Sequence, residues 1–212
     1  QNARQLLTLR SDQKGPRTGK HMEDLGIIEN GAVAVTSDTI VAVGKTKEVL
    51  DQFKINKKTK VIDAKGKVVL PGFVDCHTHP VFASTREEEF EMRIKGKSYQ
   101  EIAASGGGIK SSVKALRSKS KEELIQLTLP RLDRMLSYGT TTIEAKSGYG
   151  LSLEDEIKML EVIYELNRIH PIDLIPTFLG AHEIPEEYKN KRKDYIRLII
   201  EKMIPEVAKR KL

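Results

Sequence analysis

The feature that most constrains the fold is an alternation of short apolar runs with longer amphipathic segments in the second part of the chain. Runs rich in apolar and β-branched residues occur at 73–79, 140–145 and 172–179, and segments with helical periodicity separate them. Strand–helix–strand order of this kind predicts parallel strands joined by right-handed crossovers. We therefore expect an α/β fold in this part of the chain.

The intervening helices carry recognisable start and stop signals. Ser120 is followed three residues later by Glu123, which predicts a capping box, and Gly139 is placed to end that helix. Ser152 is placed to cap a second helix whose apolar residues recur on one face. A further helix is expected from about Asp194 onward.

The first 66 residues show a different pattern. Three β-branched runs lie between turn residues, which predicts strands. They occupy residues 32–36, 39–43 and 60–63. A short helix is expected at 45–53, and the polar segment 11–24 is expected to be a loop. We predict a small β-rich domain over residues 1–66 and an α/β domain over residues 67–212.

The length of the second domain limits how much of a barrel it can contain. A closed barrel of eight strand–helix units needs roughly 250 residues. The segment after residue 70 has room for only about three such units, so we expect the first part of an α/β barrel. A complete small doubly wound domain is the alternative, but it would need neither the β-rich leader nor the chemistry described below.

Charge and composition favour an ordinary solvated, lysine-rich surface over one that binds nucleic acid or another anionic partner. The net charge is +6, but the lysines are scattered among glutamates and no aromatic residues interleave with a basic stripe. The apolar runs are too short to cross a bilayer, and the N-terminus does not resemble a signal peptide. A single cysteine, Cys76, fits a reducing cytoplasm. A homodimer is an assembly that the sequence allows.

The motif His77-Thr-His79 ends the first strand of the α/β segment. Alternate side chains of a strand share a face, so both imidazoles are expected to point the same way. Neutral imidazoles bind zinc and iron, and barrel enzymes carry their chemistry at the carboxyl ends of the strands. We predict that His77 and His79 are metal ligands, with an ordinary surface pair as the alternative.

The residues around this motif resemble a known superfamily. The run from Pro71 to His79, after a β-rich leader, is similar to the opening of the amidohydrolase superfamily. Four further segments resemble its imidazolonepropionase family. They are residues 86–90, 106–109, 144–151 and 180–182. The resemblance implies a partial TIM-like (β/α)8 barrel preceded by a composite β-sandwich domain.

The resemblance also implies a reaction. Members of this family hydrolyse the cyclic amide of 4-imidazolone-5-propionate to N-formimidoyl-L-glutamate in histidine degradation, with one zinc or iron ion that activates water. His77 and His79 resemble the first two metal ligands. The third histidine, an aspartate and a proton-transferring acid come from later strands in the family, so no catalytic residue is assigned here. We expect the 212-residue chain alone to be inactive.

Three residues resemble substrate-binding groups of the family. Arg86 resembles the residue that binds the propionate, and a guanidinium suits a carboxylate; an ion pair with Glu87 or Glu89 is the alternative. Tyr149 follows the second strand and resembles a ligand-contacting tyrosine, although it could be a packing aromatic. His182 follows the third strand and resembles a histidine that touches the imidazolone ring, although it could be structural.

Neighbouring residues have more than one interpretation. Lys146 could be a carboxylated, metal-bridging lysine, but the family that the chain resembles has a mononuclear site. Glu144 could be a buried group behind the metal ligands or could pair with Lys146. The run Gly106-Gly-Gly108 could cradle phosphate, but no helix-opening fingerprint surrounds it. A loop that approaches the site closely is the preferred interpretation.

Two other functions stay open at this point. The first is another amidohydrolase, such as a purine or pyrimidine aminohydrolase, although Arg86 with Tyr149 suits a carboxylate-bearing substrate better than a neutral base. The second is a catalytically silent fragment or a basic binding module. Bound zinc or iron would favour an enzyme, whereas a metal-free chain that binds RNA would favour the module.

Overall fold

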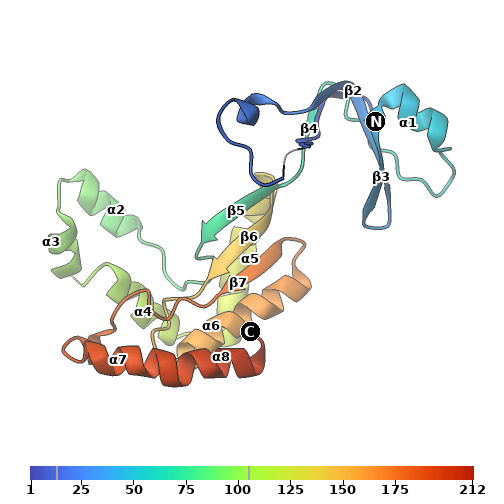
Figure 1. Ribbon diagram of the computed structural model, residues 1–212. Coiled ribbons are helices and arrows are strands. Elements are labelled where there is room, and N and C mark those ends of the chain that lie inside the picture. Colours follow the sequence, from blue (N-terminus) through green and yellow to red (C-terminus); the bar gives the residue numbers. More distant parts are fainter. Residues whose placement is uncertain (13, 105) are drawn as a thin grey trace. The chain divides into compact units, whose positions relative to one another are not determined.

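The computed structural model describes residues 1–12, 14–104 and 106–212 (Figure 1). The chain divides into two compact units, Gln1–Pro71 and Gly72–Leu212. The division falls after Pro71 rather than after residue 66, because the short strand β4 (Val68–Val69) pairs with the first strand of the chain and so stays with the first unit.

The first unit contains a four-stranded sheet with the order β3-β2-β1-β4. Its other strands are β1 (Ala3–Leu7), β2 (Ile27–Thr36) and β3 (Thr39–Lys45). β2 is antiparallel to both β1 and β3, whereas β4 runs parallel to β1. The helix α1 (Thr46–Gln52) lies within the predicted range 45–53 and is confirmed.

Two expectations for the first unit need correction. Residues 60–63, all of which the structure describes, form no strand. Near the chain start the Gln1 ammonium donates to the Ile62 carbonyl at 2.9 Å and the Asn2 side-chain amide group donates to the Asp63 carboxylate at 3.0 Å, while the parallel partner of β1 is β4. The segment 11–24, predicted as a loop, contains the short 3-10 helix η1 (Gly19–Glu23); its residue Gln13 lies outside the described residues.

The second unit is a mixed α/β arrangement around a three-stranded parallel sheet with the order β5-β6-β7. This confirms the predicted parallel pairing of three strands. The strands are β5 (Phe73–Thr78), β6 (Thr140–Lys146) and β7 (Asp173–Thr177). Four helices lie between β5 and β6, and one connects β6 to β7. They are α2 (Glu87–Ile94), α3 (Tyr99–Ala104), α4 (Ile109–Arg117), α5 (Lys121–Ser137) and α6 (Leu153–Ile169).

The expected helix signals are present. The Ser120 hydroxyl accepts from the Glu123 amide at 3.1 Å and the Glu123 carboxylate accepts from the Ser120 amide at 2.9 Å, which confirms the capping box. Gly139 turns the chain out of α5 with a φ of +92°. The Ser152 hydroxyl caps α6 by accepting from the Asp155 amide at 3.1 Å.

After β7 the chain passes through the 3-10 helix η2 (Glu186–Tyr188) into a continuous helical segment. This segment consists of α7 (Arg192–Leu198), the π-helical turn η3 (Ile199–Met203) and α8 (Ile204–Arg210). It begins two residues before the expected position at Asp194. No helix among the described residues is long and apolar enough to cross a membrane.

The capping box gives a quantitative expectation for stability. Ser120→Ala should lower the free energy of unfolding by about 1 kcal/mol, because an amide at the start of α5 loses its acceptor. Ser137→Ala is the matched control, since Ser137 is exposed at the other end of the same helix. Urea unfolding of both variants would measure the difference; equal stabilities would show that the box contributes nothing.

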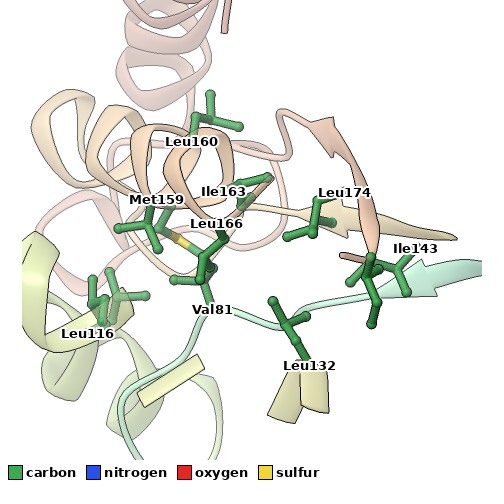
Figure 2. Packing of buried hydrophobic residues seen from close by; sticks show 13 residues of the cluster. Val81, Leu116, Leu132, Ile143, Met159, Leu160, Ile163, Leu166 and Leu174 are labelled. Carbon is green, nitrogen blue, oxygen red and sulfur yellow. The ribbon is translucent and has the colours of Figure 1, made fainter. Parts of the chain in front are cut away.

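One face of the parallel sheet carries the main core. Side chains of β6 and β7 point toward those of α6, as Figure 2 shows for Ile143, Leu174 and Leu166. The alternate residues of β6, including Glu144 and Lys146, are partly exposed and lie on the opposite face. The side chains at the carboxyl ends of the strands therefore project from an ordered, close-packed support.

Candidate active site

The segments that follow β5, β6 and β7 bring four ring side chains together. His79 comes directly after β5, Tyr149 follows β6, and His182 follows β7. The His79 and His182 rings stack with centroids 4.8 Å apart, and Tyr149 lies 5.0 Å from His79 and 5.4 Å from His182. The His77 ring lies 6.0 Å from that of His79 in an edge-on arrangement. Four of the five predicted site residues thus form one cluster.

His79 has the properties of a neutral imidazole. Burial lowers the pKa of His79 to about 4, and the nearby His182 and His77 rings act in the same direction. Its Nδ1 atom is buried and has no hydrogen-bond partner in the described part of the chain. A neutral ring with an unsatisfied nitrogen, close to a second imidazole, fits a share in a metal site.

The two histidines alone do not complete such a site. Among the described residues, there is no group of three or more His, Cys, Asp or Glu side chains that could hold a metal ion. A tetrahedral zinc ion needs three or four protein ligands. His77 and His79 would therefore supply only part of a ligand set.

The loop after β6 is built for a close approach to His182. Gly148 has a φ of +105°, and a Cβ atom there would lie 2.8 Å from the Cβ of His182. The Gly148 carbonyl oxygen lies 3.0 Å from Nδ1 of His182. Because a carbonyl only accepts, Nδ1 is the donor in this contact, and Nε2 is the ring nitrogen left available to a ligand. Burial raises the pKa of the neighbouring Tyr149, which keeps its hydroxyl protonated.

Arg86 lies near the ring cluster and lines a hollow together with His79 and Tyr149. This hollow of about 290 Å³ is lined by residues of the segment after β5, of α4 and of the loop after β6. They are His79, Phe82, Ser84, Thr85, Arg86, Ser112 and Tyr149. Arg86 and Tyr149 thus line this hollow, and His182 lies beside Tyr149. These are the three residues expected from the sequence to bind the substrate.

The guanidinium of Arg86 is paired with Glu89, one of the two ion pairs weighed from the sequence. Its Nε donates to Oε2 of Glu89 at 2.8 Å, which raises the pKa of Arg86 and lowers that of Glu89. The other Glu89 oxygen accepts from the Gly108 amide at 2.7 Å. The glycine run therefore approaches the site closely, as preferred from the sequence, and Glu89 ties it to Arg86.

Glu144 and Lys146 form the ion pair that the sequence left open. The Glu144 carboxylate also accepts from the Thr177 hydroxyl at 2.8 Å, which links β6 to β7. These contacts lower the pKa of Glu144. The Lys146 ammonium is thus engaged with a carboxylate of its own strand.

Sequence reasoning missed Arg131. Its guanidinium lies 3.5 Å from the Phe82 ring centroid and donates to the carbonyls of Pro80 and Phe82 at 3.2 and 2.8 Å. It thereby fixes the segment that leaves His79. An arginine on an amphipathic helix gives no sequence signal for such a role, because most arginines there face solvent.

Comparison with known proteins shows which protein family and which known fold the chain resembles. Residues 60–110 match the model of the amidohydrolase family. The fold resembles that of guanine deaminase from E. coli, with a TM-score of 0.53 and 18 % identity over 77 % of this chain and 34 % of that chain. Residues 60–110 are thus similar to the amidohydrolase family, and the fold of the chain is similar to that of this deaminase.

The similarity extends to one group of enzymes in particular. Over nearly its whole length the chain is similar to proteins named imidazolonepropionase. The protein from Symbiobacterium thermophilum is 52 % identical over 92 % of this chain and 46 % of its own length. Those from Geobacillus kaustophilus and Alkaliphilus oremlandii are 51 % and 47 % identical over 99 % and 100 % of this chain, and over 50 % of their own lengths. The chain spans about half the length of these curated relatives.

Proposed function

We propose that the full-length protein is an imidazolonepropionase. It would hydrolyse the cyclic amide of 4-imidazolone-5-propionate to N-formimidoyl-L-glutamate in histidine degradation. The observation that carries this proposal is the 46–52 % identity to imidazolonepropionases over nearly the whole chain. The meeting of His79, Tyr149 and His182 at the strand ends supports it.

His77 and His79 would hold one zinc or iron ion together with ligands from beyond this chain. When bound, such an ion polarises a carbonyl and lowers the pKa of water. The neutrality of His79 and its unsatisfied nitrogen support this role. The amidohydrolase family, whose model matches residues 60–110, is generally metal-dependent, which supports the same assignment.

The other side chains would bind and orient the substrate. Arg86 would take the propionate carboxylate through guanidinium hydrogen bonds, with Glu89 holding the guanidinium in place. Nε2 of His182 would face a ring N–H of the imidazolone, and the Tyr149 hydroxyl would donate to the ligand. These contacts would hold the ring so that its carbonyl faces the His77–His79 end of the site.

The architecture of the full-length protein follows from the same proposal. The β5–β7 unit would be the first part of a TIM-like (β/α)8 barrel, and the first unit would be part of a composite β-sandwich. The similarity in fold to guanine deaminase supports the comparison with an amidohydrolase domain. The partner would be a small molecule rather than nucleic acid, in the cytoplasm, and a homodimer is part of this proposal.

A substrate comparison tests the function. The full-length protein should hydrolyse 4-imidazolone-5-propionate with a kcat/KM of roughly 10⁴ M⁻¹s⁻¹ or above, the ordinary range for enzymes. Guanine is the control substrate, because it lacks a carboxylate for Arg86. Turnover of guanine without turnover of the imidazolone would assign the protein to the aminohydrolases instead.

A further inference from the structure

Glu156 is a fully buried carboxylate on the face of α6 that packs against the sheet. It lies beside Ile157 and one turn before Leu160, both of which are buried. A carboxylate is almost never buried in this way unless several donors satisfy it. At this position within an apolar stripe, the Glu156 carboxylate needs hydrogen-bond donors from neighbouring residues.

The donors come from the loop after β6. One carboxylate oxygen, Oε1, accepts from the amides of Gly150 at 2.9 Å and Leu151 at 2.8 Å. The Gly148 amide lies 3.2 Å from Oε1 and 3.1 Å from Oε2. The Ser147 hydroxyl donates to the same carboxylate. These donors match the accepting capacity of an ionised carboxylate.

The same contacts reach the loop after β7. The Ser147 oxygen accepts from the Leu179 amide at 2.8 Å, so its hydroxyl proton is directed to Glu156. The Gly148 carbonyl accepts from Nδ1 of His182 at 3.0 Å. A single carboxylate thus holds two loops through groups that lie next to Tyr149 and His182, without touching either ring itself.

The loop also needs such a restraint. Gly148 has a φ of +105° and Leu151, which is not a glycine, has a φ of 52°. A glycine adopts a positive φ readily, but a leucine at a φ of 52° persists only where the surroundings fix it. Burial raises the pKa of Glu156, and the hydrogen bonds from Ser147 and the loop amides act against that rise.

We propose that Glu156 is a positioning residue that sets Tyr149 and His182 for the substrate ring by fixing the loops that carry them. This inference rests on the proposed function only for the identity of the ring. The geometry of the restraint does not depend on which substrate the site takes.

The first test compares Glu156→Gln with Glu154→Gln in the full-length protein. Glutamine keeps the shape of glutamate, but its NH₂ group would face donors instead of accepting from them. Glu154 lies on the same helix and is exposed, so it controls for the loss of a carboxylate. Hydrogen exchange at the Gly148, Gly150 and Leu151 amides should be faster in Glu156→Gln alone.

The kinetic arm uses the same two variants. In Glu156→Gln, kcat/KM for 4-imidazolone-5-propionate should fall about tenfold to a hundredfold, because a displaced binding group loses alignment with the reacting atoms. Metal content should stay close to that of the wild type, since no hydrogen bond within the described part of the chain joins Glu156 directly to His77 or His79. Unchanged exchange and unchanged kcat/KM in Glu156→Gln would overturn the proposal.

A double-mutant cycle separates positioning from general support. If Glu156 acts through His182, then Glu156→Gln should cause little further loss in a His182→Ala background. A full multiplicative loss in both the His182→Ala and the Tyr149→Phe backgrounds would assign Glu156 to folding alone. Ser147→Ala serves as the second variant if Glu156→Gln fails to fold, because it removes only the hydroxyl that joins the carboxylate to the Leu179 amide.

The two proposals can fail separately. A wild-type protein that does not hydrolyse the imidazolone refutes the proposed function, and the exchange measurement still decides whether Glu156 holds the loop. A wild-type protein that turns over normally, with loop amides that remain protected in Glu156→Gln, refutes the positioning role alone.

Discussion

Replacing His79 with alanine in the full-length protein should abolish most hydrolysis and weaken metal binding more than any other single change in this chain. His79 is a neutral, half-buried imidazole with an unsatisfied nitrogen, 6.0 Å from the His77 ring. Loss of a direct ligand should cost more than the roughly 10–100-fold that changes behind a ligand typically cost. His77→Ala should act in the same direction.

Metal analysis and turnover of the purified variants would measure this effect. His21→Ala is the matched control, because His21 is exposed in η1 and belongs to the first unit. It should retain wild-type metal content and turnover. If His77→Ala and His79→Ala both retain them as well, the metal assignment is wrong.

Arg86→Lys should impair catalysis although the positive charge is kept. Lysine cannot reproduce the planar two-pronged contact of a guanidinium with a carboxylate. Loss of one charge-assisted contact should cost roughly 1.5–3 kcal/mol, which is on the order of 10- to 150-fold in kcat/KM. Metal content should not change, because Arg86 is paired with Glu89 and is not a proposed ligand.

Two controls distinguish substrate binding from the ion pair seen in the structure. Arg93→Lys makes the same change at an exposed position of α2 and should be neutral. An analogue without the propionate arm should be a poor substrate for the wild type, and Arg86→Lys should harm it little further. Equal harm to both substrates would mean that Arg86 only holds Glu89 and the glycine run.

Much of the second unit could be predicted because its signals are local. The capping box at Ser120 and Glu123 and the cap at Ser152 depend on residues within one helical turn. Parallel strands then place their carboxyl ends at one edge, so His79, Tyr149 and His182 meet although long helices separate them in sequence.

The errors arose where structure depends on distant partners. Residues 60–63 contain the β-branched pair Val61-Ile62, but strand propensity does not say which segment pairs with β1. The parallel partner of β1 is Val68–Val69 instead. The same pairing moved the boundary between the units to Pro71.

Glu156 was missed, and the choice between Glu87 and Glu89 was left open, for a related reason. A glutamate on an amphipathic helix usually faces solvent. The signal available for Glu156 was its position on the apolar stripe of α6, between Leu153 and Leu160. The donors that explain it come from a loop whose conformation the sequence does not specify, and the choice of Glu89 over Glu87 as the partner of Arg86 likewise depends on side-chain geometry.

The most direct test of the central claim is product analysis by mass spectrometry, after reaction of the full-length protein with 4-imidazolone-5-propionate in water enriched in heavy oxygen. Hydrolysis of the cyclic amide breaks one ring C–N bond, adds one molecule of water and releases no ammonia. The expected product is N-formimidoyl-L-glutamate that carries one heavy oxygen atom in its new carboxylate. Release of ammonia, or recovery of the intact ring with a fully metal-loaded protein, would contradict the proposed function.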